Sequence, residues 1–146
     1  MRNLSLLVAI FTAVALIAGC GGTGLHTIVV TGTVTFDGEP LEGAAITFTP
    51  RGEGHPAFGI TDANGRYTLQ TMLGNPDAGT TPGDYEVAIT KFEATPPRTE
   101  EEDALGLPPP SPRSLIPVRY GSTGTSGLAA TVRQGEANVF NFDLTR

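Results

Sequence analysis

The chain contains few of the side chains that most often carry catalysis or bind metals. Its 146 residues include no tryptophan, one cysteine and two histidines. A single cysteine cannot form an intramolecular disulfide, and a zinc site needs three or four Cys, His or acidic ligands in one place. His26 and His55 are too few for such a site, and no serine stands in a nucleophile motif beside a base. We therefore expect no metal, no cofactor, no catalytic residues and no enzymatic activity.

The chain also lacks an excess of positive charge. Fifteen acidic residues outnumber nine basic ones, which gives a net charge of −6. Nucleic-acid binding requires a basic surface, and attraction to anionic lipid requires clustered Lys or Arg. The composition therefore argues against a nucleic-acid partner and against membrane binding by charge.

Only one long hydrophobic run is present, at residues 4–16. It is shorter than the roughly 20 residues that a membrane-spanning helix needs, and it suits the core of a signal peptide. Ile17-Ala18-Gly19-Cys20 follows and resembles a bacterial lipobox, in which the cysteine thiol is acylated and becomes the new N-terminus. The alternative is an ordinary secretory signal followed by a chance cysteine. We expect a lipoprotein signal peptide over residues 1–19 and lipidation of Cys20.

Lipidation would determine where the protein works. Each buried methylene of an acyl chain contributes about 0.8 kcal/mol, so two or three chains hold a protein firmly on a membrane. We expect the mature protein to be anchored by its N-terminal lipid in the bacterial cell envelope, outside the cytoplasm. Residues 20–27 would form a flexible leash, and residues 28–145 would form one domain.

The domain has the alternation of apolar and polar residues that is typical of β-strands. The pattern predicts seven strands, at residues 30–36, 44–49, 58–60, 67–69, 85–89, 128–132 and 140–144. Turns rich in Gly, Pro, Asn and Asp separate them. Strands of this kind predict an all-β, two-sheet sandwich, with a barrel as the alternative. The side chains expected to be buried between the sheets include Ile46, Phe48, Ile60, Val87, Ile89, Phe140 and Phe142.

One segment departs from this pattern. Residues 93–117 contain seven prolines and an acidic run at residues 100–103, without apolar periodicity. Such a composition predicts a mobile, partly polyproline-like excursion on the surface, which could cover a sheet edge. We expect residues 93–115 to be dispensable for folding.

The segment Asp62-Ala63-Asn64-Gly65 has two interpretations. Its acidic and amide oxygens could join Asp37 or Asp84 as calcium ligands. Asp-x-Asn-Gly is more often a tight turn, in which the aspartate accepts backbone N–H groups and the glycine takes a positive φ. We favour the turn.

Several motifs in a fixed order resemble one family. They are Val30-Thr31-Gly32-Thr33-Val34-Thr35, Gly38-Glu39-Pro40-Leu41-Glu42-Gly43-Ala44, Thr61-Asp62-Ala63-Asn64-Gly65-Arg66-Tyr67 and Pro82-Gly83-Asp84-Tyr85. The series is similar to the carboxypeptidase regulatory-like domain, a transthyretin-like (prealbumin-like) sandwich close to the Cna B-type repeats of bacterial surface proteins. Later residues, Ile116-Pro117-Val118-Arg119-Tyr120 and Thr125-Ser126-Gly127-Leu128, resemble the tail of small envelope lipoproteins that carry one such domain.

The resemblance implies a fold more than an activity. The family's domain is non-catalytic, and the first-strand lysine of the isopeptide-forming Cna B-type domains is absent, because Lys91 is the one lysine of the chain. Tyr120-Gly121-Ser122 is only faintly similar to the end of the transthyretin-related hydrolases and lacks their arginine.

Two functions remain open. The first is a structural or protein-interaction module of the envelope. The alternative is a lipoprotein that binds a small ligand, peptide or glycan between the loop at His55 and residues 72–82. A concave patch with an exposed Phe or Tyr would favour binding, and a flat, threonine-rich surface would favour the structural role.

Overall fold

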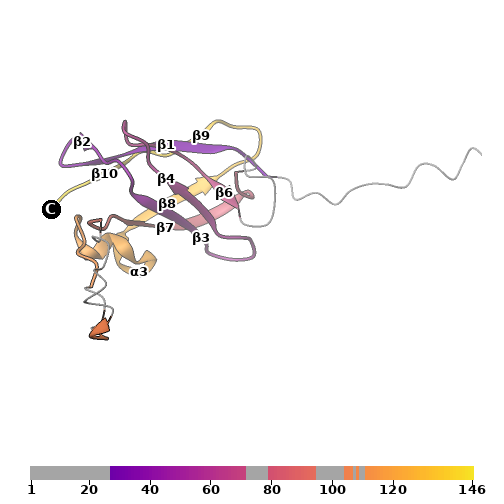
Figure 1. Cartoon of the computed structure of the whole chain (residues 1–146). Helices are drawn as coiled ribbons and strands as arrows, with labels where there is room; N and C mark the ends of the chain where they lie inside the picture. The colour runs from indigo at the N-terminus through magenta and orange to yellow at the C-terminus, as the bar shows by residue number, and fades with distance from the viewer. Residues whose placement is uncertain (1–26, 72–78, 95–103, 107, 109–110) are drawn as a thin grey trace, which may run out of the picture.

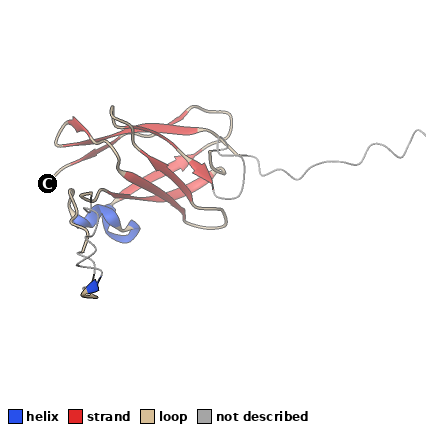
Figure 2. Ribbon diagram, viewed as in Figure 1, coloured by secondary structure: helices blue, strands red, loops and turns tan. Residues whose placement is uncertain are grey.

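Two β-sheets packed face to face make up the domain (Figures 1 and 2). The computed structural model describes residues 27–71, 79–94, 104–106, 108 and 111–146. Within them, the prediction of an all-β, two-sheet sandwich is confirmed. The predicted signal peptide, Cys20 and His26 lie outside the described residues, as does most of the leash.

The first sheet is built around β1 (Val30–Phe36). On one side β1 pairs antiparallel with β2 (Glu39–Pro40) and β5 (Arg66–Thr68). On the other side it pairs parallel with β9 (Asn138–Val139) and β10 (Phe142–Leu144). The valines of β1 face the core, and its threonines alternate with them on the outer face, as the period of two predicts.

The second sheet is wholly antiparallel. Its order is β6 (Gln70–Thr71), β4 (Ala57–Ile60), β3 (Ala45–Pro50), β7 (Gly83–Thr90) and β8 (Leu128–Val132). The two longest of these strands, β3 and β7, pair over six residues at the centre of the sheet.

Two of the seven predicted strands each have a further short strand next to them in the structure. The predicted strand at 67–69 is observed as β5, and the chain leaves the first sheet at Leu69 and enters the second as β6. The predicted strand at 140–144 is observed as β10, and β9 precedes it, with Phe140 and Asn141 between the two. There the Asn141 side chain replaces the missing backbone partner, accepting hydrogen bonds from Thr33 N–H at 3.0 Å and Thr33 Oγ1 at 2.9 Å. β2 is additional and arises from the turn at Asp37 and Gly38.

The core is centred on Phe48 of β3. Its ring lies 5.9–6.4 Å from four other aromatic rings, all at tilted or edge-on angles that aromatic pairs favour. The neighbours come from both sheets and are Tyr67, Tyr85, Phe140 and Phe142. Aliphatic side chains complete the core: Val30, Val34, Ile46, Leu69, Val87, Ile89, Val132 and Leu144.

The prediction for β4 is wrong by one residue. Ile60 is 72% exposed and Phe58 is 38% exposed, while Ala57 is fully buried. In the observed register Ala57 lies opposite Phe48 and Gly59 lies opposite Ile46, so these two small residues face the core. A shift of one residue moves every side chain of a strand to the other face. Phe140, also predicted to be buried, is only partly buried because it sits at the break between β9 and β10.

The Pro-rich excursion is also more ordered at its ends than predicted. Phe92 and Ser114 form an antiparallel bridge, Glu93 N–H donates to Arg113 O, and Leu115 N–H donates to Lys91 O. Ile116 is buried in the core. Residues 113–116 therefore form part of the fold, whereas 95–103, 107 and 109–110 lie outside the described residues. That residues 93–115 are dispensable for folding stays a prediction.

Two short helical turns connect the excursion to β8. They are the 3-10 helix η2 (Val118–Gly121) and α3 (Thr123–Ser126). At four residues each, they are too short to produce a helical hydrophobic period, and the sequence did not indicate them. Tyr120 fixes η2 against the last strand, since its hydroxyl accepts Thr145 N–H at 3.1 Å and donates to Thr145 O at 3.2 Å.

Candidate functional site

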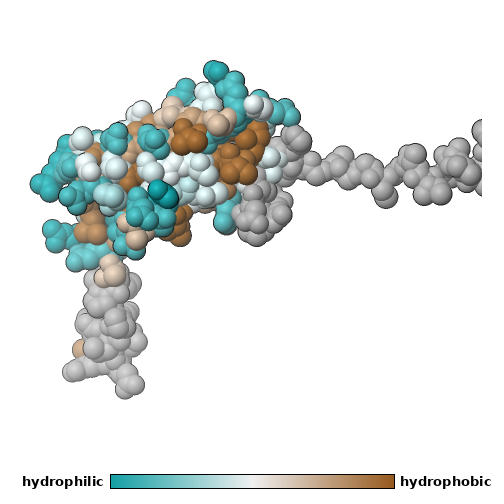
Figure 3. All heavy atoms as spheres, turned by 90° about the horizontal axis from the view of Figure 1, so that it is seen from above, coloured by the Kyte–Doolittle hydropathy of each residue, from teal (hydrophilic) through white to brown (hydrophobic). Residues whose placement is uncertain are grey.

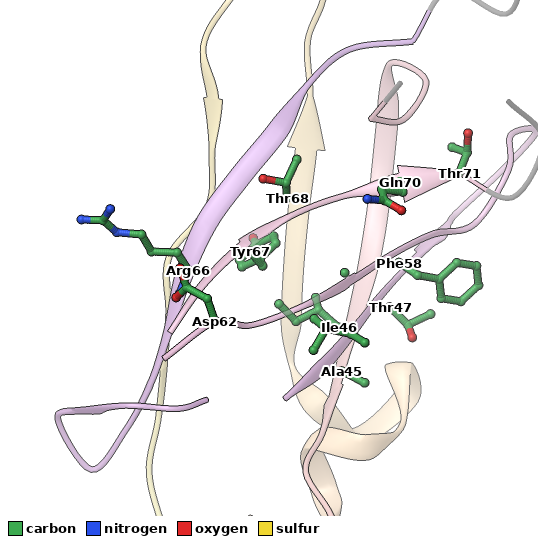
Figure 4. Close-up of a pocket in the computed structure, with 12 residues that line it drawn as sticks. Ala45, Ile46, Thr47, Phe58, Asp62, Arg66, Tyr67, Thr68, Gln70 and Thr71 are labelled. Atoms are coloured by element: carbon green, nitrogen blue, oxygen red, sulfur yellow. The ribbon is translucent and has the colours of Figure 1, made fainter. Parts of the chain in front are cut away.

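An open groove runs between β4 and β5 and has a volume of about 930 Å³ (Figure 4). It follows from the way the chain changes sheets. At one end Asp62 N–H donates to Arg66 O at 2.8 Å, and at the other end Phe58 pairs with Gln70. Between these points β4 stays in the second sheet while β5 pairs with β1 in the first. The two strands therefore diverge and leave a hollow along the side of the sandwich.

Apolar side chains form the floor and one wall of the groove. Ile46 and Tyr67 are buried and lie at its base. Phe58 and Ile60 stand on the outer face of β4, two residues apart, and are both exposed. In Figure 4 the Phe58 ring projects away from the sheet beside Thr47, which is its cross-strand partner on β3.

Uncharged polar groups line the groove beside this apolar wall. Gln70 lies opposite Phe58 on β6, and Thr68 comes from β5. Charged groups are confined to the turn end, where Asp62 and Arg66 lie side by side (Figure 4). The groove is thus apolar along β4 and polar along β5 and β6.

Asp62 stabilises the turn that closes this end. Its Oδ1 accepts Asn64 N–H at 2.8 Å and Arg66 N–H at 2.9 Å, and Gly65 has φ +70°. The prediction of a tight turn is confirmed. The bonds from Arg66 N–H, and then from Asn64 N–H, hold the pKa of the Asp62 carboxyl below its usual range. A depressed pKa favours the folded state above the ordinary pKa of an aspartate, and this contribution disappears as the pH falls through the folded-state value.

Tyr67 is a structural part of the floor. Its hydroxyl donates to Phe140 O at 2.8 Å, linking β5 to the break between β9 and β10. Burial raises the pKa of this phenol well above its usual value, so it stays neutral at physiological pH. On the other side of β5 a smaller hollow of about 290 Å³ shares Arg66, Tyr67 and Thr68 with the groove.

One buried hydroxyl at the groove has no partner. Within the residues that the structure describes, Thr71 Oγ1 is the only buried side-chain oxygen or nitrogen without a hydrogen bond. Thr71 lines the groove at the end of β6. An unsatisfied buried hydroxyl costs roughly 1–3 kcal/mol of stability. Because this oxygen is closed to solvent, a ligand in the groove would not reach it without a local movement of the chain.

The candidate catalytic groups of the sequence do not come together. Ser126 Oγ donates to Val87 O, and Ser114 Oγ donates to Ile116 O at 2.7 Å, so both hydroxyls serve the backbone. His55 lies partly buried in the loop before β4 and does not line the groove. Over the described ranges, no group of three His, Cys, Asp or Glu side chains could hold a metal ion.

The sequence located the groove only approximately. It placed a binding rim between the His55 loop and residues 72–82, of which 72–78 lie outside the described part. The groove instead follows the strands that adjoin those two segments. The available signal is the Ala57-Phe58-Gly59-Ile60 alternation, whose hydrophobicity predicts the wrong inner face.

Apolar side chains are also exposed elsewhere on the molecule. Figure 3 shows brown apolar groups among polar ones, with a large group close to where the grey N-terminal trace leaves the sandwich. Val29, just before β1, and Val139 on β9 are both more than half exposed. Among the described residues, no helix is long and apolar enough to cross a membrane.

Comparison of the chain with family models, with curated proteins and with solved structures finds no match. The functional interpretation therefore depends on the groove and on the sequence.

Proposed function

We propose that this protein is a non-enzymatic, lipid-anchored β-sandwich of the bacterial cell envelope that acts as a protein-interaction module. The groove between β4 and β5 is its contact surface. The observation that supports this most directly is the pair of exposed apolar side chains, Phe58 and Ile60, on one wall of an open groove with polar neighbours. A small apolar centre with a polar rim is the usual composition of a protein interface.

A partner segment in an extended conformation suits this shape. The groove extends along β4 from the Asp62 turn to Thr71 and is open to solvent, so an extended chain could lie in it without threading through a narrow entrance. Covering a large apolar side chain completely contributes about 1.5–3 kcal/mol. Phe58 and Ile60 are therefore the expected centres of binding energy.

The transthyretin-like type of the sandwich is part of this proposal. The motifs that resemble the carboxypeptidase regulatory-like domain fall on strand β1, on the β2 hairpin, on the Asp62 turn and on the start of β7. These are positions where turn chemistry decides the path of the chain. The absence of a convergent acid, base and nucleophile among the described side chains supports a non-catalytic role.

Photo-crosslinking in native membranes tests the groove. We expect benzoylphenylalanine in place of Phe58, in the full chain, to give a discrete crosslinked product that contains peptides of a second protein. The same probe in place of Phe92, which is more exposed (49% against 38%) but lies outside the groove, should not give it. Ile60→Asp should reduce the product at position 58 by at least tenfold, because a charge on the wall opposes apolar contact. Equal labelling from both probe positions would contradict the proposal.

A glycan is the second candidate ligand. The observation in its favour is the exposed Phe58 ring beside the Gln70 amide, a pairing of an apolar surface with a hydrogen-bonding group. In the same experiment a crosslinked product whose added mass is removed by glycan-degrading enzymes, and which contains no peptides of a second protein, would favour a glycan over a protein partner.

Lipidation of Cys20 gives a separate prediction. Cys20→Ser should move the protein from the membrane fraction to the soluble fraction, because the acyl chains supply the anchor. Mass spectrometry of the native protein should find a diacyl or triacyl cysteine at the N-terminus and no residues 1–19. A mature N-terminus beyond Cys20, or membrane retention of Cys20→Ser, would contradict the anchor while leaving the groove hypothesis intact.

A further inference from the structure

The edges of the two sheets are protected to very different degrees. An open edge presents unpaired N–H and C=O groups, and proteins usually shield it with short strands, charges, prolines or bulges. The edge strand β6 is protected by its length of only two residues. The edge strand β2 is equally short and consists of a charged residue and a proline, Glu39 and Pro40. The outer edge of β9 and β10 is broken at Phe140 and carries Asp143.

β8 has none of these protections. It is a continuous strand of five residues, Leu-Ala-Ala-Thr-Val, without charge or proline. It pairs with β7 on one side. On the other side, within the described residues, no backbone hydrogen bond joins it to another strand. Its outward side chains, Ala129 and Thr131, are small and exposed, so they leave the edge accessible.

We propose that β8 is a self-association edge and that its partner is β8 of a second copy of this chain. When the same strand of two copies pairs antiparallel, a twofold axis relates the copies, so each copy offers the same edge to the other. The two second sheets would then join into one continuous sheet.

Residue chemistry fits pairing centred on Ala130. In that register Ala129 lies opposite Thr131 of the second copy, and Leu128 lies opposite Val132. The outer face then brings only small side chains together. On the inner face Leu128, which is partly buried in one copy, gains an apolar neighbour beside the core. Arg133, the nearest charge after β8, would lie opposite Gly127, so no like charges oppose each other.

The neighbouring elements limit this contact to β8. Immediately before Leu128 the chain forms α3, whose Ser126 Oγ donates to Val87 O and thereby occupies the edge of β7. The groove lies at the opposite edge of the same sheet, near β6 and β4. Pairing through β8 would leave both grooves open, so the two proposals can fail independently.

Cysteine crosslinking in the full chain tests the pairing. Directly opposed residues of antiparallel strands have Cα atoms about 4.5–5.5 Å apart, within the range that a disulfide spans. Two differently tagged chains, Ala129→Cys and Thr131→Cys, are co-expressed and oxidised in the membrane. We expect a disulfide-linked dimer that carries both tags. The unaltered chain, with Cys20 alone, and a Glu39→Cys chain on the β2 edge should give at least tenfold less.

Like charges introduced at the proposed interface provide the second test. The double variant Ala129→Lys/Thr131→Lys should lose the dimer, because lysines would face lysines across the axis. Within one copy these positions lie beside Glu86 and Asp84, so the fold should tolerate them, and an unchanged thermal transition checks this. Mixing it with the differently tagged unaltered chain should restore a mixed dimer, because each lysine then faces Thr131 or Ala129 of the other copy. Glutamates at these positions are avoided, since they would lie beside Glu86 and Asp84 of the same copy. No crosslink from either cysteine position, alone or together, or crosslinks to a different protein, would overturn the proposal.

Discussion

Phe48→Ala is expected to destabilise the domain by about 3–5 kcal/mol. Phe48 is fully buried, and its ring contacts aromatic side chains from both sheets. Alanine would remove the common neighbour of Tyr67, Tyr85, Phe140 and Phe142 and leave a cavity between the sheets. Since a domain of this size is stable by only about 5–15 kcal/mol, the loss would unfold a substantial fraction of the protein at moderate temperature.

Phe58→Ala is the matched control for this experiment. It removes the same ring from the adjacent strand, but Phe58 lies on the outer face of the sheet. We expect a loss below about 1 kcal/mol, as is usual for surface substitutions away from special features. Urea unfolding of both variants gives the comparison, with an unchanged slope as the check that the denatured states are alike. Equal losses would show that β4 has the register that the sequence suggested.

The strands were predictable where alternation and side-chain size agree. β1, β3, β7 and β8 each place large or branched residues on one face and threonine or alanine on the other, and their burial follows the pattern. The Asp62 turn was predictable because its chemistry is local. The carboxylate accepts hydrogen bonds from backbone amides that are at most four residues away.

The prediction of which β4 side chains face the core was wrong because residues elsewhere in the chain determine the register of this strand. By hydrophobicity alone, Phe58 and Ile60 are the better inner face. The observed register is set by β3, which aligns Ala57 and Gly59 with the bulky Phe48 and Ile46. At position 59 a Cβ would lie 3.0 Å from the carbonyl oxygen of Thr68, so the residue beneath β5 must be small. No local pattern contains that constraint.

The candidate site was unpredictable for the same reason. The groove exists because one continuous run of chain, β5 and then β6, pairs first with β1 and then with β4. Propensity predicts a strand there and does not specify which sheet it joins. The sequence shows which residue types this stretch contains. The shape of the groove depends on the passage of the chain from one sheet to the other, which the sequence does not show.

Glycine substitutions should reveal how closely the chain approaches itself at such crossings. A Cβ at Gly32 would lie 1.8 Å from the carbonyl oxygen of Phe140 and 2.8 Å from the Tyr67 hydroxyl. Gly32→Ala must therefore push the break between β9 and β10 away from β1 and disrupt the bond between Tyr67 and Phe140. Overpacking usually costs about 1–3 kcal/mol, and we expect a loss at or above the upper end because the obstacle is backbone.

Two other glycines make this a graded series. Gly59→Ala meets the carbonyl of Thr68 at 3.0 Å, a contact that a small shift of β5 relieves, so a loss of about 1 kcal/mol is expected. Gly124→Ala in α3 meets nothing within 4 Å and should be neutral or stabilising by up to about 1 kcal/mol, since alanine favours helix. Urea unfolding ranks the three, and amide exchange of residues 138–144 should accelerate for Gly32→Ala alone. If Gly32→Ala were as stable as Gly124→Ala, the last two strands could not lie against β1 as they do here, and the floor of the groove would lose its attachment to them.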